Sequence, residues 1–75
     1  MELRVIELQI IEHTSAEGIN QYAAHVEEGA SVALLAKTLW EGKVHIYTVN
    51  GSLSNSKTIL KHGDVVDVYP LMMGA

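Results

Sequence analysis

The residues that can do chemistry are scattered along the chain, except for one group at its end. The chain has no cysteine, which excludes disulfides, thiolate metal sites and a thiol nucleophile. No serine stands in a recognisable pattern with a histidine and an orienting acid. The histidines show no metal-ligand spacing, and we expect each to be a surface or strand-edge residue: His13, His25, His45 and His62. We therefore expect neither a metal site nor an independent enzyme.

The last residues, "YPLMMGA", place three large apolar side chains before two very small residues. Chain ends are usually polar and frayed, so an apolar end calls for a reason. Residues 71–75 reach about 16 Å when extended, and methionine adapts to irregular apolar grooves. The pattern predicts a flexible tail that inserts into a partner and presents its free carboxylate there. The competing interpretation is a strand extension that packs on the protein's own core.

Composition restricts the class of protein. The 75 residues support one domain, and 48% of them are apolar, which is enough for an ordered core. The net charge is −4 and the five basic residues are scattered, so we expect no nucleic-acid partner. The longest apolar stretch, "ASVALLA", is far shorter than a membrane span, and the N-terminus lacks the features of a signal peptide. We expect a soluble, cytoplasmic protein without a membrane partner, monomeric when free.

The elements that must position this tail follow from hydrophobic periodicity and turn residues. Alternation predicts a first strand over 3–11, and "EHTSAEGIN" predicts a loop over 12–20. Ser31 suits a helix N-cap, and Val32, Leu35, Ala36 and Leu39 then share one helical face. Asn50-Gly51 is the strongest signal for a tight hairpin turn. The remaining expectations are strands at 21–26, 43–49 and 65–70, a helix to Trp40, a short edge strand within 52–60 and a turn at 62–64.

These elements predict an α+β domain over residues 1–70, with a tail at 71–75. One helix is expected to cover one face of a mixed sheet of four to five strands, with the final strand beside the first. Two hairpin-like units flanking a helix form the β-grasp (ubiquitin-like) arrangement. Alternation places Tyr69 opposite Val66 and Val68, away from the helix, where Tyr69 and Val65 contribute to an exposed apolar patch. We expect Trp40 to cap the core, and Glu27, Glu28 and Asp67 to be solvated.

Three stretches carry a resemblance to a known family: "VEEGASVALLAKTL", "VNG" and "LKHGDVVDVYP", followed by the thin C-terminus. They resemble the ThiS/MoaD sulfur-carrier proteins, which are ubiquitin-like β-grasp proteins, and the resemblance runs from about Tyr22 to the end. It implies a carrier and not an enzyme. An E1-like adenylyltransferase would use ATP to adenylate the C-terminal carboxylate, and sulfur would replace AMP. The thiocarboxylate would then supply a sulfur-accepting synthase, with no cofactor bound to the carrier.

The tail follows the family pattern until its last residue. Pro70 and Leu71 match the paired prolines, Met72 and Met73 the next pair, and Gly74 the penultimate glycine; Ala75 replaces the terminal one. The resemblance implies docking of Tyr69, Pro70, Leu71, Met72 and Met73 on the activating enzyme, and chemistry at Gly74 and Ala75. An added methyl in a tight pocket costs roughly 1–3 kcal/mol.

The alanine leaves three interpretations open: a carrier with an adapted partner, a relative that kept binding but lost transfer, or a natural chain that ends elsewhere. A non-transferring ubiquitin-like interaction module is thus the alternative to the carrier. Conjugation to lysine, in the manner of ubiquitin, requires the same activation. The sequence is compatible with thiamine thiazole or molybdopterin-type cofactor biosynthesis.

Overall fold

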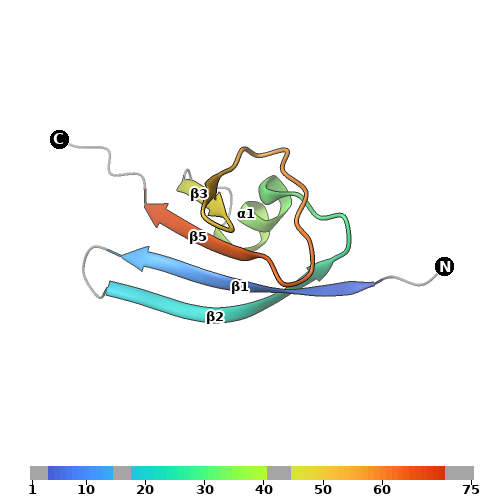
Figure 1. Cartoon of the computed structure of the whole chain (residues 1–75), viewed down its shortest axis with the longest axis horizontal. Coiled ribbons are helices and arrows are strands. Elements are labelled where there is room, and N and C mark those ends of the chain that lie inside the picture. The colour runs from blue at the N-terminus through green and yellow to red at the C-terminus, as the bar shows by residue number, and fades with distance from the viewer. Residues whose placement is uncertain (1–3, 15–17, 41–44, 71–75) are drawn as a thin grey trace.

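The computed structural model describes residues 4–14, 18–40 and 45–70. Along the chain, its elements are β1 (Val5–Thr14), β2 (Gly18–Glu27), α1 (Val32–Trp40), β3 (His45–Val49), β4 (Ser52–Leu53) and β5 (Val65–Pro70) (Figure 1). The strands form one sheet in the order β2-β1-β5-β3-β4. β5 runs parallel to β1, and every other neighbouring pair is antiparallel. The predicted α+β arrangement, with the last strand beside the first, is therefore confirmed.

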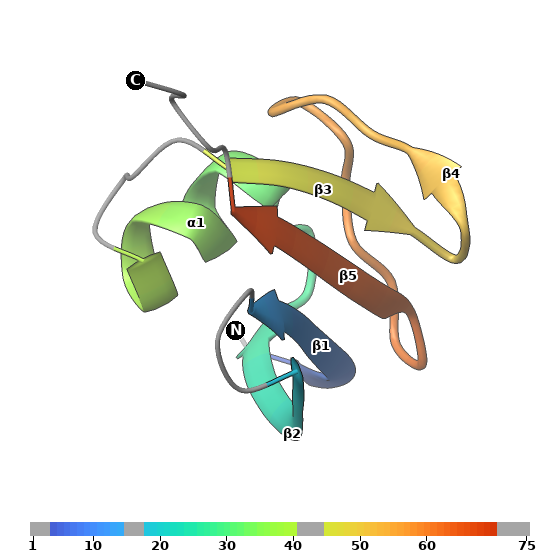
Figure 2. The same ribbon diagram turned by 90° about the vertical axis from the view of Figure 1, so that its left-hand side faces the viewer.

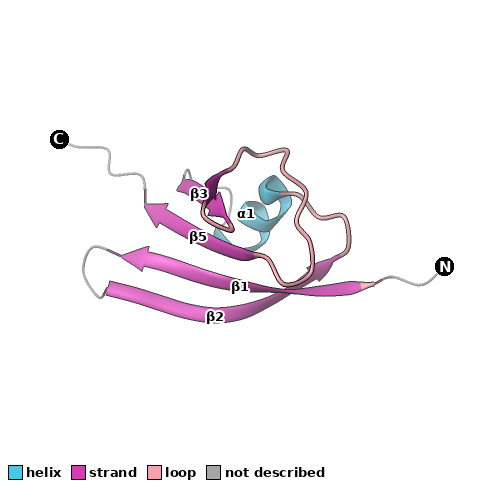
Figure 3. Cartoon of the chain, in the orientation of Figure 1, coloured by secondary structure: helices cyan, strands magenta, loops and turns pink. Residues whose placement is uncertain are grey.

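The helix α1 lies on one face of the sheet, and no other element of the described ranges covers the opposite face (Figures 2 and 3). Strands β1 and β5 lie at the centre of the sheet, whereas β2 and β4 form its two edges. The final strand is thus held on both sides, by β1 and by β3. The last described residues of the chain therefore lie in the middle of the sheet and not at an edge.

The hairpin of β1 and β2 is longer than the sequence predicts. The two strands pair without a break from Val5 and Glu27 to Thr14 and Gly18. The predicted loop over 12–20 is therefore wrong, because residues 12–14 and 18–20 continue the strands. Polar side chains gave the loop signal, but Asn20 and Glu12 face each other across the pair, and Asn20 Nδ2 donates to Glu12 Oε1 at 3.2 Å. A cross-strand polar pair stabilises a sheet as an apolar pair does.

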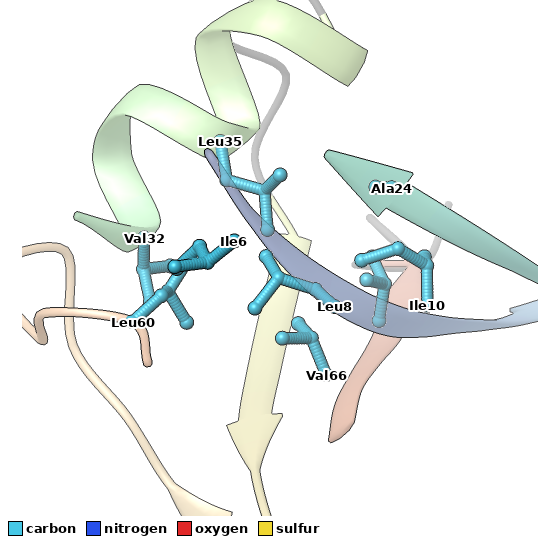
Figure 4. Close-up of a cluster of buried hydrophobic side chains, with 9 residues drawn as sticks. Ile6, Leu8, Ile10, Ala24, Val32, Leu35, Leu60 and Val66 are labelled. Atoms are coloured by element: carbon cyan, nitrogen blue, oxygen red, sulfur yellow. The ribbon is translucent and has the colours of Figure 1, made fainter. Parts of the chain in front are cut away.

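The core lies between the sheet and the helix. Alternate residues of β1 point towards α1 and meet residues of β5 and of the helix (Figure 4). The buried cluster contains Ile6, Leu8, Ile10, Ala24, Val32, Leu35, Leu60, Val66 and Val68. Full burial of a large aliphatic side chain contributes about 1.5–3 kcal/mol relative to exposure. Trp40 packs against this cluster, which confirms its predicted position at the border of the core.

The helix begins at the predicted residue, but its buried face is shorter than predicted. Ser31 Oγ accepts a hydrogen bond from the Leu34 amide at 3.2 Å, as expected of an N-cap. The amides of Val32 and Ala33 donate instead to carbonyls of the segment between β4 and β5, Thr58 O and Ser56 O respectively. These bonds satisfy two of the first-turn amides that have no acceptor within the helix. Val32 and Leu35 are buried, but Leu39, predicted on the same face, is exposed.

Candidate functional site

The candidate site lies where β5 ends. Of the residues predicted to act there, Tyr69 and Pro70 belong to β5. The other predicted site residues, Leu71, Met72, Met73, Gly74 and Ala75, lie outside the described residues, as does the predicted flexible tail. Pro70 pairs with His45 at the end of the register between β3 and β5. The prediction that the ladder ends at the proline, which has no amide hydrogen to donate, concerns pairing beyond the described residues.

Tyr69 lies on the sheet face away from α1, as alternation predicts, because Val66 and Val68 are buried under the helix. Its ring stacks on the ring of His13 from β1, with centroids 4.3 Å apart and planes inclined by 13°. Its hydroxyl lies 3.4 Å from Asp67 Oδ2. The tyrosine is half-buried. The last side chain of β5 that the structure describes is therefore held by neighbours on two strands.

The structure places His13 and Asp67 differently from the sequence predictions. Both are half-buried, although His13 was placed in a loop and Asp67 was predicted to be solvated. His13 Nε2 lies 3.5 Å from Asp67 Oδ2, close enough for an ion pair when the imidazole is protonated. Sequence reasoning missed this cluster because residue 13 was assigned to the loop. The parallel pairing of β1 with β5, which runs to Glu12 and Val68, brings His13 beside Tyr69.

We call the sheet surface opposite α1 the open face. Four of its large apolar side chains are exposed: Val5 of β1 (62%), Ile19 of β2 (65%), Ile46 of β3 (43%) and Leu53 of β4 (78%). Ile19 pairs with His13, and Ile46 pairs with Tyr69. A row of side chains thus crosses the open face at the end of β5 from Ile19 to Ile46. The predicted apolar patch exists, but these flanking isoleucines expose it more than Tyr69 and Val65, which are half-buried.

The charges on the open face are acidic or histidine. By register, the described strand residues on this face include Glu7, Glu27 and Asp67 but no lysine or arginine. His25 Nε2 lies 3.2 Å from Glu7 Oε2, and both side chains are well exposed. Complementary charge across an interface favours the matching partner and speeds its encounter. The open face therefore combines exposed apolar side chains with acidic and histidine groups.

The opposite face carries a second polar cluster, centred on Glu12. Glu12 Oε2 accepts hydrogen bonds from Tyr22 Oη at 2.7 Å and from Trp40 Nε1 at 2.8 Å. Burial, reinforced by the hydrogen bond and charge of Glu12, raises the pKa of Tyr22. Burial also raises the pKa of Tyr47, whose ring lies 5.6 Å from that of Trp40. This cluster ties the end of the helix to β1 and β2, which makes its role structural.

The remaining histidines behave as surface groups where they are described. His25 and His62 are exposed, as predicted, and His62 Nδ1 accepts a hydrogen bond from the Glu7 amide at 3.1 Å. Across residues 4–14, 18–40 and 45–70, no three histidine or acidic side chains are grouped so as to hold a metal ion. In the same ranges, no helix has both the length and the apolar character needed to cross a membrane.

No family model matches the chain, and no curated protein matches it either.

Proposed function

We propose that this protein is a ubiquitin-like β-grasp sulfur carrier. Its C-terminal carboxylate, on Ala75, would be adenylated and thiocarboxylated by an E1-like activating enzyme for thiamine thiazole or molybdopterin-type cofactor biosynthesis. The chain would serve that enzyme, and the synthase that accepts the sulfur, as a protein co-substrate. ATP would be bound by the enzyme and not by the carrier, and the reactions would take place in the cytoplasm.

The sheet topology is the observation that carries this proposal. Two hairpins, β1–β2 and β3–β4, flank the single helix, and the last strand returns between β1 and β3. This order supports the β-grasp. It also holds β5, the strand that precedes the proposed tail, between two neighbouring strands, so that a partner pulling on residues 71–75 would pull against the centre of the sheet. A carrier needs such an anchor, because its end must enter another protein while its domain stays folded.

The open face supports docking next to the tail. The stacked pair of His13 and Tyr69 stands at the same end of β5 as Pro70. Exposed Ile19 and Ile46 flank the pair. An activating enzyme that contacts this row would hold the domain while residues 71–75 extend towards its nucleotide. The acidic charge of the face agrees with a partner whose contact surface is basic.

The chemistry would take place on the terminal carboxylate. An oxygen of the Ala75 carboxylate would attack the α-phosphorus of ATP and release pyrophosphate. A sulfide-level donor would then displace AMP from the acyl adenylate and leave a thiocarboxylate. The first step is tested by pyrophosphate–ATP exchange on an activating enzyme with the full chain as co-substrate. Exchange that depends on the chain supports the proposal, and its absence with an enzyme active on a Gly-Gly-ended carrier contradicts it.

The alternative function is a non-transferring interaction module with the same domain. The alanine at position 75, where the resembled family has glycine, favours this alternative, as does the apolar open face. Deletion of Gly74 and Ala75 separates the two functions. A docking module would keep most of its partner affinity after the deletion, whereas a carrier would lose all transfer.

A further inference from the structure

The turn between β3 and β4 is held to β5 by the backbone and the side chain of one asparagine. Asn50 has a left-handed backbone, with φ of 53°, so it leaves the geometry of the strand. Its amide still donates to Val65 O at 2.8 Å, in line with the ladder between β3 and β5. The Val65 amide, however, donates to Asn50 Oδ1 at 2.9 Å. The side-chain carbonyl therefore takes the place of a strand carbonyl.

The other end of the same carboxamide is also fixed. Asn50 Nδ2 donates to Asp64 Oδ1 at 2.9 Å. The second oxygen of that carboxylate accepts from the Lys61 amide at 2.8 Å, which holds the carboxylate in place. The carboxamide is thus bound at its oxygen and at its nitrogen, although Asn50 itself is exposed.

We propose that Asn50 is a site of spontaneous deamidation. The closed turn, in which the Asn50 side chain is hydrogen-bonded to Val65 and Asp64, blocks this reaction. The backbone nitrogen of Gly51 is the nucleophile, and glycine has no side chain to hinder it. Attack on Asn50 Cγ releases ammonia and forms a cyclic imide, which water opens to an aspartyl or isoaspartyl residue. The reaction requires only water. It also requires Cγ to swing towards the Gly51 nitrogen, and this breaks the hydrogen bonds to Val65 and Asp64.

The product does not fit the closed turn. A carboxylate at position 50 would face the carboxylate of Asp64 at hydrogen-bond distance, and like charges so close repel each other. An isoaspartyl linkage would also add a methylene to the backbone of a two-residue turn. Deamidation would therefore mark chains whose turn has opened, and it would hinder the turn from closing again on β5.

The proposal is tested on the full chain by peptide-mapping mass spectrometry during incubation at mildly alkaline pH, with and without urea. We expect Asn50 to deamidate at least about tenfold more slowly in the folded protein, since two hydrogen bonds must open. Asp64→Ala should raise the rate in the folded protein on the order of tenfold. Asp67→Ala removes the same charge from β5 away from the turn and should leave the rate unchanged. Equal rates with and without urea, or an Asp64→Ala variant no faster than Asp67→Ala, would overturn the proposal.

A second measurement does not depend on the folding of Asp64→Ala. Asn50→Asp imitates one product and should lower the urea midpoint at neutral pH. The double variant Asn50→Asp/Asp64→Asn reverses the donor and the acceptor while keeping one carboxylate, so it should recover most of the loss. A double variant no more stable than Asn50→Asp would show that the charge contact with Asp64 does not affect stability. This result would contradict the proposal that the deamidated product does not fit the closed turn.

Discussion

Removal of the Glu12 carboxylate should destabilise the domain more than its position on a half-exposed strand suggests. In the variant Glu12→Ala, the hydroxyl of Tyr22 and the indole N–H of Trp40 both lose the oxygen that accepts their hydrogen bonds. The two donors are half-buried, so water replaces the carboxylate only in part. The contact between the end of α1 and the hairpin of β1 and β2 should weaken.

The size of the effect follows from the two short hydrogen bonds. A hydrogen bond to a charged group contributes about 1.5–3 kcal/mol when buried. Partial exposure of Tyr22 and Trp40 reduces this, and we expect a total loss of about 2–3 kcal/mol. A domain of this size has a free energy of unfolding of roughly 4–11 kcal/mol. Glu12→Gln keeps one acceptor oxygen without its charge, and should lose about 1 kcal/mol.

The assay is urea denaturation followed by the fluorescence of Trp40, which is the only tryptophan in the chain. The native emission of Glu12→Ala should also shift to the red as the indole N–H meets water. Glu28→Ala is the control, because it removes the same charge from an exposed position. If Glu12→Ala unfolds within about 0.5 kcal/mol of the control, as surface substitutions do, the carboxylate does not hold the helix and our account of this cluster is wrong.

Three further predictions concern the core, the tyrosines and the open face. Leu35→Ala removes a fully buried side chain and should cost about 2–5 kcal/mol in urea denaturation. Since the pKa values of Tyr22 and Tyr47 are raised by folding, the stability they contribute is complete below about pH 10 and is lost as the pH rises through the folded pKa. The urea midpoint should therefore fall above pH 10, and less steeply in Tyr22→Phe. Ile46→Glu should weaken binding to an activating enzyme by about tenfold or more in titration calorimetry.

Each of these has its own contradicting result. A Leu35→Ala variant as stable as the wild type would show that the Leu35 side chain does not contribute to the core. A Tyr22→Phe variant that loses stability above pH 10 as steeply as the wild type would show that the Tyr22 hydroxyl is not kept protonated by the fold. For the open face, Leu34→Glu on α1 is the matched control, because Leu34 is 49% exposed and Ile46 43%. Equal losses of affinity in the two variants would remove the open face as the docking surface.

Local signals in the sequence predicted much of the fold. Ser31 caps the helix as its side chain suggests, and Asn50 and Gly51 both have the positive φ that a tight turn requires. The alternation in β5 correctly separated Tyr69 from the buried Val66 and Val68. These features depend on neighbours within a few residues, so composition and periodicity are sufficient to find them.

The features that were missed depend on pairing between distant segments. Glu12 and His13 look like loop residues because they are polar and precede a glycine-containing stretch. Their roles arise only from the register of β1, which sets Glu12 under Trp40 and His13 beside Tyr69. Leu60 is another example, because it is buried from a weakly patterned segment that also pairs with the start of the helix. A one-residue shift in the register of β1 would have exchanged the faces of Glu12 and His13.

The central claim is tested most directly by the intact mass of the full chain after incubation with an activating enzyme, ATP and a sulfur donor. The proposed function predicts an ATP-dependent mass increase equal to the replacement of one oxygen by sulfur, located by fragmentation at the carboxylate of Ala75. If the same enzyme converts a Gly-Gly-ended carrier and leaves this chain with an unmodified carboxylate, the chain is not a carrier for that enzyme. The interaction module would then become the better account of the open face.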